Sequence, residues 1–112
     1  MDLRTPMHLY RNQDLVGSIV GYGYETPWAT GSIEDVDADR AERSDRVAEF
    51  LRWADEDVDD DAFDAEMARR GVTQADVDWC RRGDWVIRTR DGIDHRVYSL
   101  DFLTERTIQW RW

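Results

Sequence analysis

Strand-type sequence occupies both ends of this chain, and an acidic, helix-type segment separates them. Residues 34–78 carry 17 acidic residues and six arginines, a net charge of −11, whereas residues 81–112 have a net charge of +2. Runs of strands that flank a run of helices are typical of α+β folds. The order therefore predicts one antiparallel sheet from N-terminal and C-terminal strands (βββ–ααα–βββ), with three short helices packed on one face. A length of 112 residues fits a single domain, residues 1–112.

The N-terminal part contains three predicted strands. Residues 7–10 form the first, and residues 12–14 (Asn-Gln-Asp) are a turn, because Asn and Asp tolerate turn backbones. The second strand starts near Val16 and ends before Pro27, which lacks an N–H donor. A short strand runs from Trp28 to Glu34. Strand alternation predicts that Val20, Tyr22 and Tyr24 share one face.

Three glycines, at positions 17, 21 and 23, fall on the opposite face of the second strand. One interpretation is that they let the sheet coil under a crossing helix, since glycines inside strands are usually structural. The other is that they floor a shallow groove walled by Tyr22, Tyr24 and Trp28. With His95 or His8 as the acid–base group, that groove would make the chain a small-ligand-binding domain or a weak enzyme.

The acidic segment contains three predicted helices. The first has an apolar face at helical spacing, formed by Val47, Phe50, Leu51, Ala54 and Val58. A second helix follows residues 59–61 and ends at Gly71, a typical helix-terminating residue. Residues 73–76 (Thr-Gln-Ala-Asp) resemble a capping box with Asp in place of Glu, so a third helix is predicted over residues 74–82.

The C-terminal part contains the remaining strands. Residues 85–89 form a strand, residues 90–92 (Arg-Asp-Gly) form a hairpin turn, and residues 93–100 form the return strand. Residues 107–112 alternate clearly, with Ile108, Trp110 and Trp112 on one face. We expect residues 109–112 to form an edge strand, which makes a homodimer through that edge possible.

The charge indicates the class of partner. A net charge of −10 disfavours binding to nucleic acid or to anionic membranes and favours basic protein partners. We expect a non-catalytic protein-interaction module whose acidic helices dock a basic partner. Its charges would be Asp57, Asp59, Asp60 and Asp61, and Trp53 would be its aromatic anchor. In size and charge the chain is similar to small acidic bacterial immunity proteins and inhibitors. Solubility, or adaptation to a salty cytosol, is the alternative explanation of the charge.

Residues 55–66 resemble an EF-hand calcium loop. Asp55, Asp57 and Asp59 occupy loop positions one, three and five, and Glu66 occupies position twelve. The pattern departs from the EF-hand at the sixth position, where Asp60 replaces the glycine of the sharp turn. Calcium binding is therefore one alternative, and an acidic linker that caps the second helix is the other. No other cofactor is expected.

The remaining features indicate neither an enzyme nor a secreted protein. The serines and Cys80 lack the surroundings of a catalytic nucleophile, and Cys80 is expected to be a small buried side chain. Residues 1–10 lack the apolar segment of a signal peptide, and a single cysteine cannot form an internal disulfide. The expected location is the cytoplasm.

Overall fold

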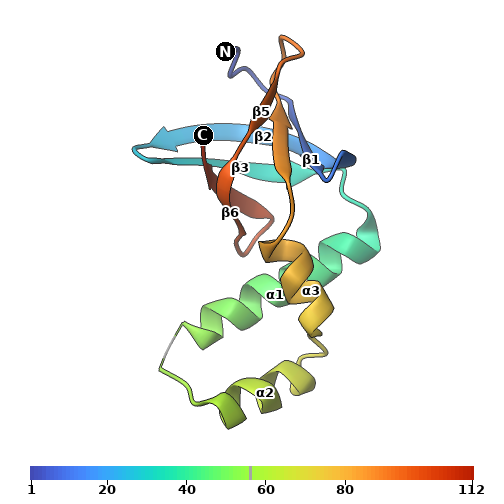
Figure 1. Ribbon diagram of the computed structural model, residues 1–112, viewed down its shortest axis with the longest axis vertical. Helices are drawn as coiled ribbons and strands as arrows, with labels where there is room; N and C mark the ends of the chain where they lie inside the picture. The colour runs from blue at the N-terminus through green and yellow to red at the C-terminus, as the bar shows by residue number, and fades with distance from the viewer. Residues whose placement is uncertain (56) are drawn as a thin grey trace.

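The computed structural model of the chain describes residues 1–55 and 57–112 (Figure 1). In this described part, three strands, three helices and four strands follow one another, which confirms the predicted α+β class. The N-terminal strands are β1 (Met7–Arg11), β2 (Asp14–Glu25) and β3 (Trp28–Glu34). The helices are α1 (Ala38–Ala54), α2 (Asp60–Arg69) and α3 (Gln74–Arg81). The C-terminal strands are β4 (Trp85–Arg88), β5 (Asp94–Arg96), β6 (Tyr98–Phe102) and β7 (Thr107–Arg111).

All strands belong to one antiparallel sheet with the order β5-β4-β1-β2-β3-β7-β6. The two outermost strands, β5 and β6, are consecutive in sequence and are separated by Val97. β5 pairs with β4 and β6 pairs with β7, while the Val97 N–H donates to the Trp85 carbonyl at 3.0 Å. The sheet therefore curls until its two edges come together in one bent strand, and it encloses its own core.

The core lies on the inner face of this curled sheet. Its fully buried side chains alternate along the strands, as expected when successive residues point to opposite faces. They are Met7, Leu9, Ile19, Ala29, Ile87, Ile108 and Trp110, all 0% exposed. At the end of the sheet nearest the helices, Trp79 of α3 packs against Trp85 and Phe102 at ring-centroid distances of 5.5 and 5.8 Å.

Gly21 interrupts the regular alternation of β2. The register between β2 and β3 shifts just after Val20, and Gly21 has a φ of 61°. An extra residue of this kind is a β-bulge, which bends a strand. Val20 pairs with an exposed residue of β3, whereas Tyr22 packs on buried Trp110 at a centroid distance of 6.0 Å. The prediction that Val20 and Tyr22 share a face is therefore wrong. Gly21 has the structural role expected of the strand glycines, but the helices lie at one end of the sheet rather than across β2 (Figure 1).

The three helices lie together at one end of the sheet (Figure 1), and α1 and α3 both contact β6. Their ends follow local sequence signals. Gly71, with a φ of 67°, follows α2, as predicted. Thr73 caps α3 by accepting a hydrogen bond from the Asp76 N–H at 3.2 Å, which confirms the predicted start of this helix.

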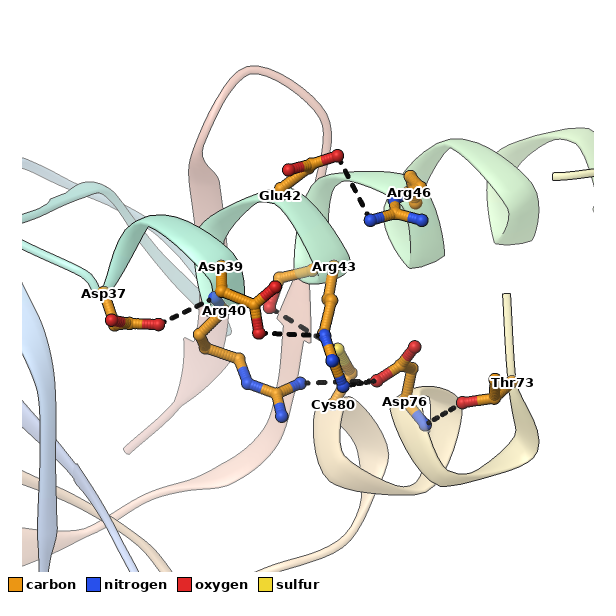
Figure 2. A network of polar contacts seen from close by, with 10 residues as sticks. Asp37, Asp39, Arg40, Glu42, Arg43, Arg46, Thr73, Asp76 and Cys80 are labelled. Atoms are coloured by element: carbon orange, nitrogen blue, oxygen red, sulfur yellow. Dashed lines mark hydrogen bonds and ion pairs between the residues drawn. The ribbon is translucent and has the colours of Figure 1, made fainter. Parts of the chain in front are cut away.

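Asp76 joins α3 to α1 (Figure 2). Asp76 is only 7% exposed. Its carboxylate lies 3.5 Å from the guanidinium of Arg43 and 3.8 Å from that of Arg40. The carboxylate thus faces α1, so in the described residues only the Thr73 half of the capping box forms. Cys80 lies beside this cluster and is buried, as predicted, and burial raises the pKa of its thiol.

Arg11 fixes the sheet to the helices at a second place. Its Nε donates to the carbonyl of Trp79 at 3.1 Å, and its Nη2 donates to the carbonyl of Arg82 at 2.7 Å. The guanidinium also lies 5.1 Å from the centroid of the Trp79 ring and 5.8 Å from that of Trp85. Arg11 therefore ties β1 to the C-terminal end of α3.

Three further expectations are wrong. Val58 lies between α1 and α2 rather than on a helix, because α1 ends at Ala54. Residues 93–100 do not form one strand, since the chain bends at Val97 to pair with two different neighbours. The predicted edge strand is an interior one, because β7 pairs with both β3 and β6.

Candidate functional site

The predicted acidic surface lies where α1 is followed by α2. We call it the acidic corner and define it by six exposed aspartates, namely Asp55, Asp57, Asp59, Asp60, Asp61 and Asp64. Asp55 caps the C-terminus of α1 and Asp59 caps the N-terminus of α2, where its carboxylate accepts from the Ala62 N–H at 2.7 Å. The corner is therefore built around a helix start, where negative charge is favourable.

Charge at the acidic corner is uncompensated. Among the residues that the structure describes, none of the six aspartates forms an ion pair with an arginine, although other acids of the helices do. Asp39 pairs with Arg43 at 3.0 Å, and Glu42 pairs with Arg46 at 3.1 Å. The stretch that carries these aspartates, from the end of α1 into α2, lies at the end of the molecule away from the sheet (Figure 1).

Trp53, the predicted aromatic anchor, is near the C-terminus of α1 and is half-buried. Its ring stacks on Phe50 at a centroid distance of 6.1 Å and an interplanar angle of 24°. It lines a groove of about 480 Å³ together with Glu49, Arg52, Arg70, Thr104 and Glu105. The indole thus combines a fixed orientation with an accessible edge, the combination typical of an interface anchor.

Most residues that match the EF-hand pattern serve other purposes in the structure, namely helix capping and pairing with arginines. Asp55 and Asp59 cap two helices, and Glu66 lies on α2. The Glu66 carboxylate accepts from Nε of Arg70 at 2.8 Å and also binds Arg69, and these arginines lower its pKa to about 2. In residues 1–55 and 57–112, no group of three or more His, Cys, Asp or Glu side chains is placed to hold a metal ion.

A second cluster of candidate residues occupies the end of the sheet opposite the helices. We call it the aromatic end and define it as Tyr22, His95, Trp110 and Trp112. Trp112 lies at the centre, 6.3 Å from the Tyr22 ring, 5.8 Å from the His95 ring and 5.6 Å from the Trp110 ring. Its Nε1 donates to the Tyr22 hydroxyl at 3.1 Å. The structure thus brings together two predicted site residues, Tyr22 and His95.

Of the other predicted members of the ligand groove, Tyr24 borders the aromatic end, whereas Trp28 and His8 lie on the outer face of the sheet. Tyr24 pairs with Ala29 on the inner face and is 56% exposed, so it borders the aromatic end. Trp28 neighbours Ala29 in sequence and therefore points to the outer face, where Arg111 lies 5.8 Å from its ring centroid. His8 pairs with Arg88 on the outer face and does not share a site with His95.

Sequence reasoning missed the immediate partners of His95. The hydroxyl of Thr89 lies 3.1 Å from Nε2 of His95 and donates to the carboxylate of Asp91. The signal was present in the predicted turn, because an Asp-Gly hairpin over residues 90–92 places Thr89 and His95 on the same face. The predicted turn is confirmed, with a φ of 80° at Gly92.

Comparisons with family models, with curated proteins and with solved structures give no match for this chain. In the part of the chain that the structure describes, no helix is both long and apolar enough to span a membrane. The acidic corner and the aromatic end are therefore the two candidate sites of this protein.

Proposed function

We propose that this protein is a non-catalytic interaction module that binds a basic protein through the acidic corner, with Trp53 as an anchor. The observation that carries this proposal is the separation of charge. Asp39 and Glu42 of α1 pair with arginines, whereas the six aspartates of the corner are exposed and have no arginine partner among the described residues. Such a surface attracts cations over a distance of about a Debye length, ~8 Å in physiological salt.

Two parts of this surface would contribute to binding, the exposed carboxylates and the Trp53 ring. The exposed carboxylates accelerate encounter with a positively charged surface and suppress binding to negatively charged ones. Trp53 supplies apolar contact area at a fixed position, because its ring already stacks on Phe50. A partner that presents Arg or Lys side chains around an apolar patch would satisfy both requirements.

The test is capture of a partner from host lysate with the purified protein, first in low salt and then in high salt. We expect one basic protein that is released by high salt, and we expect its capture to fail when Asp57, Asp59, Asp60 and Asp61 are changed together to Asn. Asn still caps helices, so the Asp59→Asn change leaves the start of α2 intact.

A matched control removes the same charge from the sheet. Asp14→Asn, Glu25→Gln, Glu34→Gln and Asp35→Asn together neutralise four exposed acids away from the corner. This variant should keep the partner. Equal loss in both variants would mean that only net charge matters, and retention by the corner variant would contradict the proposal.

A second candidate function is binding of a small ligand at the aromatic end. The contact of both Tyr22 and His95 with Trp112 favours it. A ligand there would contact Tyr24, whose ring is 56% exposed. A screen for ligands that raise the melting temperature of the wild type but not of Tyr24→Ala tests this candidate, since loss of an exposed ring should change stability little.

A further inference from the structure

The β4–β5 hairpin buries one hydroxyl group among three polar neighbours. Thr89, directly after β4, is 2% exposed. Its Oγ1 is hydrogen-bonded to the carboxylate of Asp91, lies 3.1 Å from the carbonyl oxygen of Ile93, and lies 3.1 Å from Nε2 of His95. The backbone fixes this arrangement, because the Thr89 N–H donates to the Ile93 carbonyl at 3.0 Å and closes the turn.

Counting hydrogens assigns the direction of each bond. A threonine hydroxyl has one hydrogen and accepts through its lone pairs. The carboxylate of Asp91 can only accept, and it takes the hydroxyl hydrogen. The carbonyl of Ile93 already accepts from the Thr89 N–H. Oγ1 therefore faces Nε2 of His95 with its lone pairs, and this contact is favourable only if Nε2 donates.

We propose that His95 carries its proton on Nε2, held there by Thr89 and Asp91, and that Nδ1 is consequently a proton-accepting site at the aromatic end. Nδ1 makes no hydrogen bond within the described residues. It can accept a hydrogen bond from an O–H or N–H group of a ligand. Thr89 and Asp91 are positioning residues, because they act through His95.

The charges around His95 support this assignment. The hydrogen bond from Thr89, followed by the backbone N–H of Ile93, lowers the pKa of Asp91, which keeps its carboxylate an acceptor. The N-terminal amine and the backbone N–H of Asp2 act in the same direction. Asp94, next to His95 in β5, points to the outer face and binds Arg88 at 2.7 and 3.1 Å. On the β7 side His95 meets the uncharged ring of Trp112.

Nδ1 of His95 is therefore a hydrogen-bond acceptor in a ring that packs against Trp112. This acceptor nitrogen is fixed by the hairpin geometry and does not depend on the acidic corner. If the aromatic end binds a small ligand, Nδ1 is the group that would recognise a hydrogen-bond donor.

The test is NMR of protein labelled with ¹⁵N in its imidazole rings, in a His8→Gln background that leaves His95 as the one histidine. The measurement is made above the ordinary imidazole pKa of about 6.5. We expect a ring N–H signal on Nε2, slowed in exchange by its bond to a buried hydroxyl, and an unprotonated Nδ1. A proton on Nδ1, or no observable Nε2–H signal, would overturn the proposal.

Two variants separate the hydroxyl from the shape of the side chain. Thr89→Val keeps the shape and removes the acceptor, so the Nε2–H signal should disappear through fast exchange. Thr89→Ser keeps the hydroxyl and should retain it. An unchanged signal in Thr89→Val would contradict the role of Thr89. If that variant does not fold, the wild-type and Thr89→Ser spectra still decide where the proton lies.

Discussion

The acidic corner and the curled sheet both carry many charged residues, but they differ in how those charges are paired. On the sheet, two arginines around β4 and β5 have acidic partners: Arg88 pairs with Asp94 across the two strands at 2.7 Å, and Arg96 pairs with Asp84, which precedes β4, at 3.1 Å. At the corner, the aspartates face solvent without such partners in the described residues. Burial differs in parallel, because the sheet encloses a core while none of the described residues of α2 is fully buried.

The difference indicates which part of the molecule holds the fold and which part is available for binding. α2 is attached through half-buried Phe63 and Met67, and Phe63 meets Phe50 edge-on at a centroid distance of 4.9 Å. Regions with few buried contacts open locally at a lower free-energy cost than the core. We therefore expect stability to reside in the sheet and adaptability to reside around α2.

The largest effect should follow from breaking the sheet at Trp110. This side chain is 0% exposed, so Trp110→Ala should lower the free energy of unfolding by about 3–5 kcal/mol. Phe63→Ala in half-buried surroundings should cost about 1–2 kcal/mol. Urea unfolding curves measure both, and a greater loss for Phe63→Ala would reverse the comparison.

A smaller effect is expected at the connection between the two regions. Arg11→Leu removes both donors to the carbonyls of Trp79 and Arg82, at a cost of about 2 kcal/mol. Arg4→Leu is the control, because Arg4 pairs with Asp2 at the surface, and it should lower stability less than Arg11→Leu does. Thermal unfolding followed by circular dichroism compares them, and equal costs would contradict the role of Arg11.

The next prediction concerns α2 alone. Asp59→Ala removes the N-cap that accepts from the Ala62 N–H, and should cost about 1 kcal/mol. Amide hydrogen exchange should accelerate in α2 while β1 and β7 keep their protection. Asp57→Ala, at a neighbouring exposed aspartate that caps no helix, should leave exchange unchanged. Uniform acceleration over the whole chain would mean that α2 and the sheet unfold together.

The smallest effect concerns acid. Arg69 and Arg70 lower the pKa of Glu66 from 4.5 to about 2. A carboxyl with a depressed pKa in the folded state stabilises the fold above its unfolded pKa, and that contribution disappears as the pH falls toward the folded value. Between about pH 4.5 and pH 2, wild-type stability should therefore decline more steeply than that of Glu66→Gln. The melting temperatures of both proteins are measured over this pH interval. An equal decline in the two would show that these ion pairs do not stabilise the fold.

Local chemistry in the sequence was sufficient for the turns and helix ends. Thr73 and Gly71 mark helix ends because capping depends on one or a few side chains and on backbone conformation. Gly92 marks a turn for the same reason. The α+β class followed from the order of strand-type and helix-type segments, since such segments must bury their apolar faces together.

Long-range pairing was not predictable in the same way. The position of β7 between β3 and β6 depends on how the whole sheet closes, and the alternation of Ile108, Trp110 and Trp112 is compatible with an edge or an interior strand. The bulge at Gly21 reversed the expected face of Tyr22 because a single additional residue shifts the period-two pattern. For the candidate sites, the sequence identified the acidic run but not the absence of arginine partners for its described aspartates, which depends on tertiary contacts.

The interleaving of strands from both halves of the chain has a kinetic consequence. β1 needs β4, and β3 needs β7, so the curled sheet cannot close until the segment between β3 and β4 has brought distant strands together. Closing a loop costs entropy before the non-local contacts repay it, which slows folding. During synthesis the edge of β3 that pairs with β7 stays unpaired until β7 has been made. An unpaired edge of this kind recruits other chains, so aggregation of nascent molecules should be governed by how soon β7 arrives.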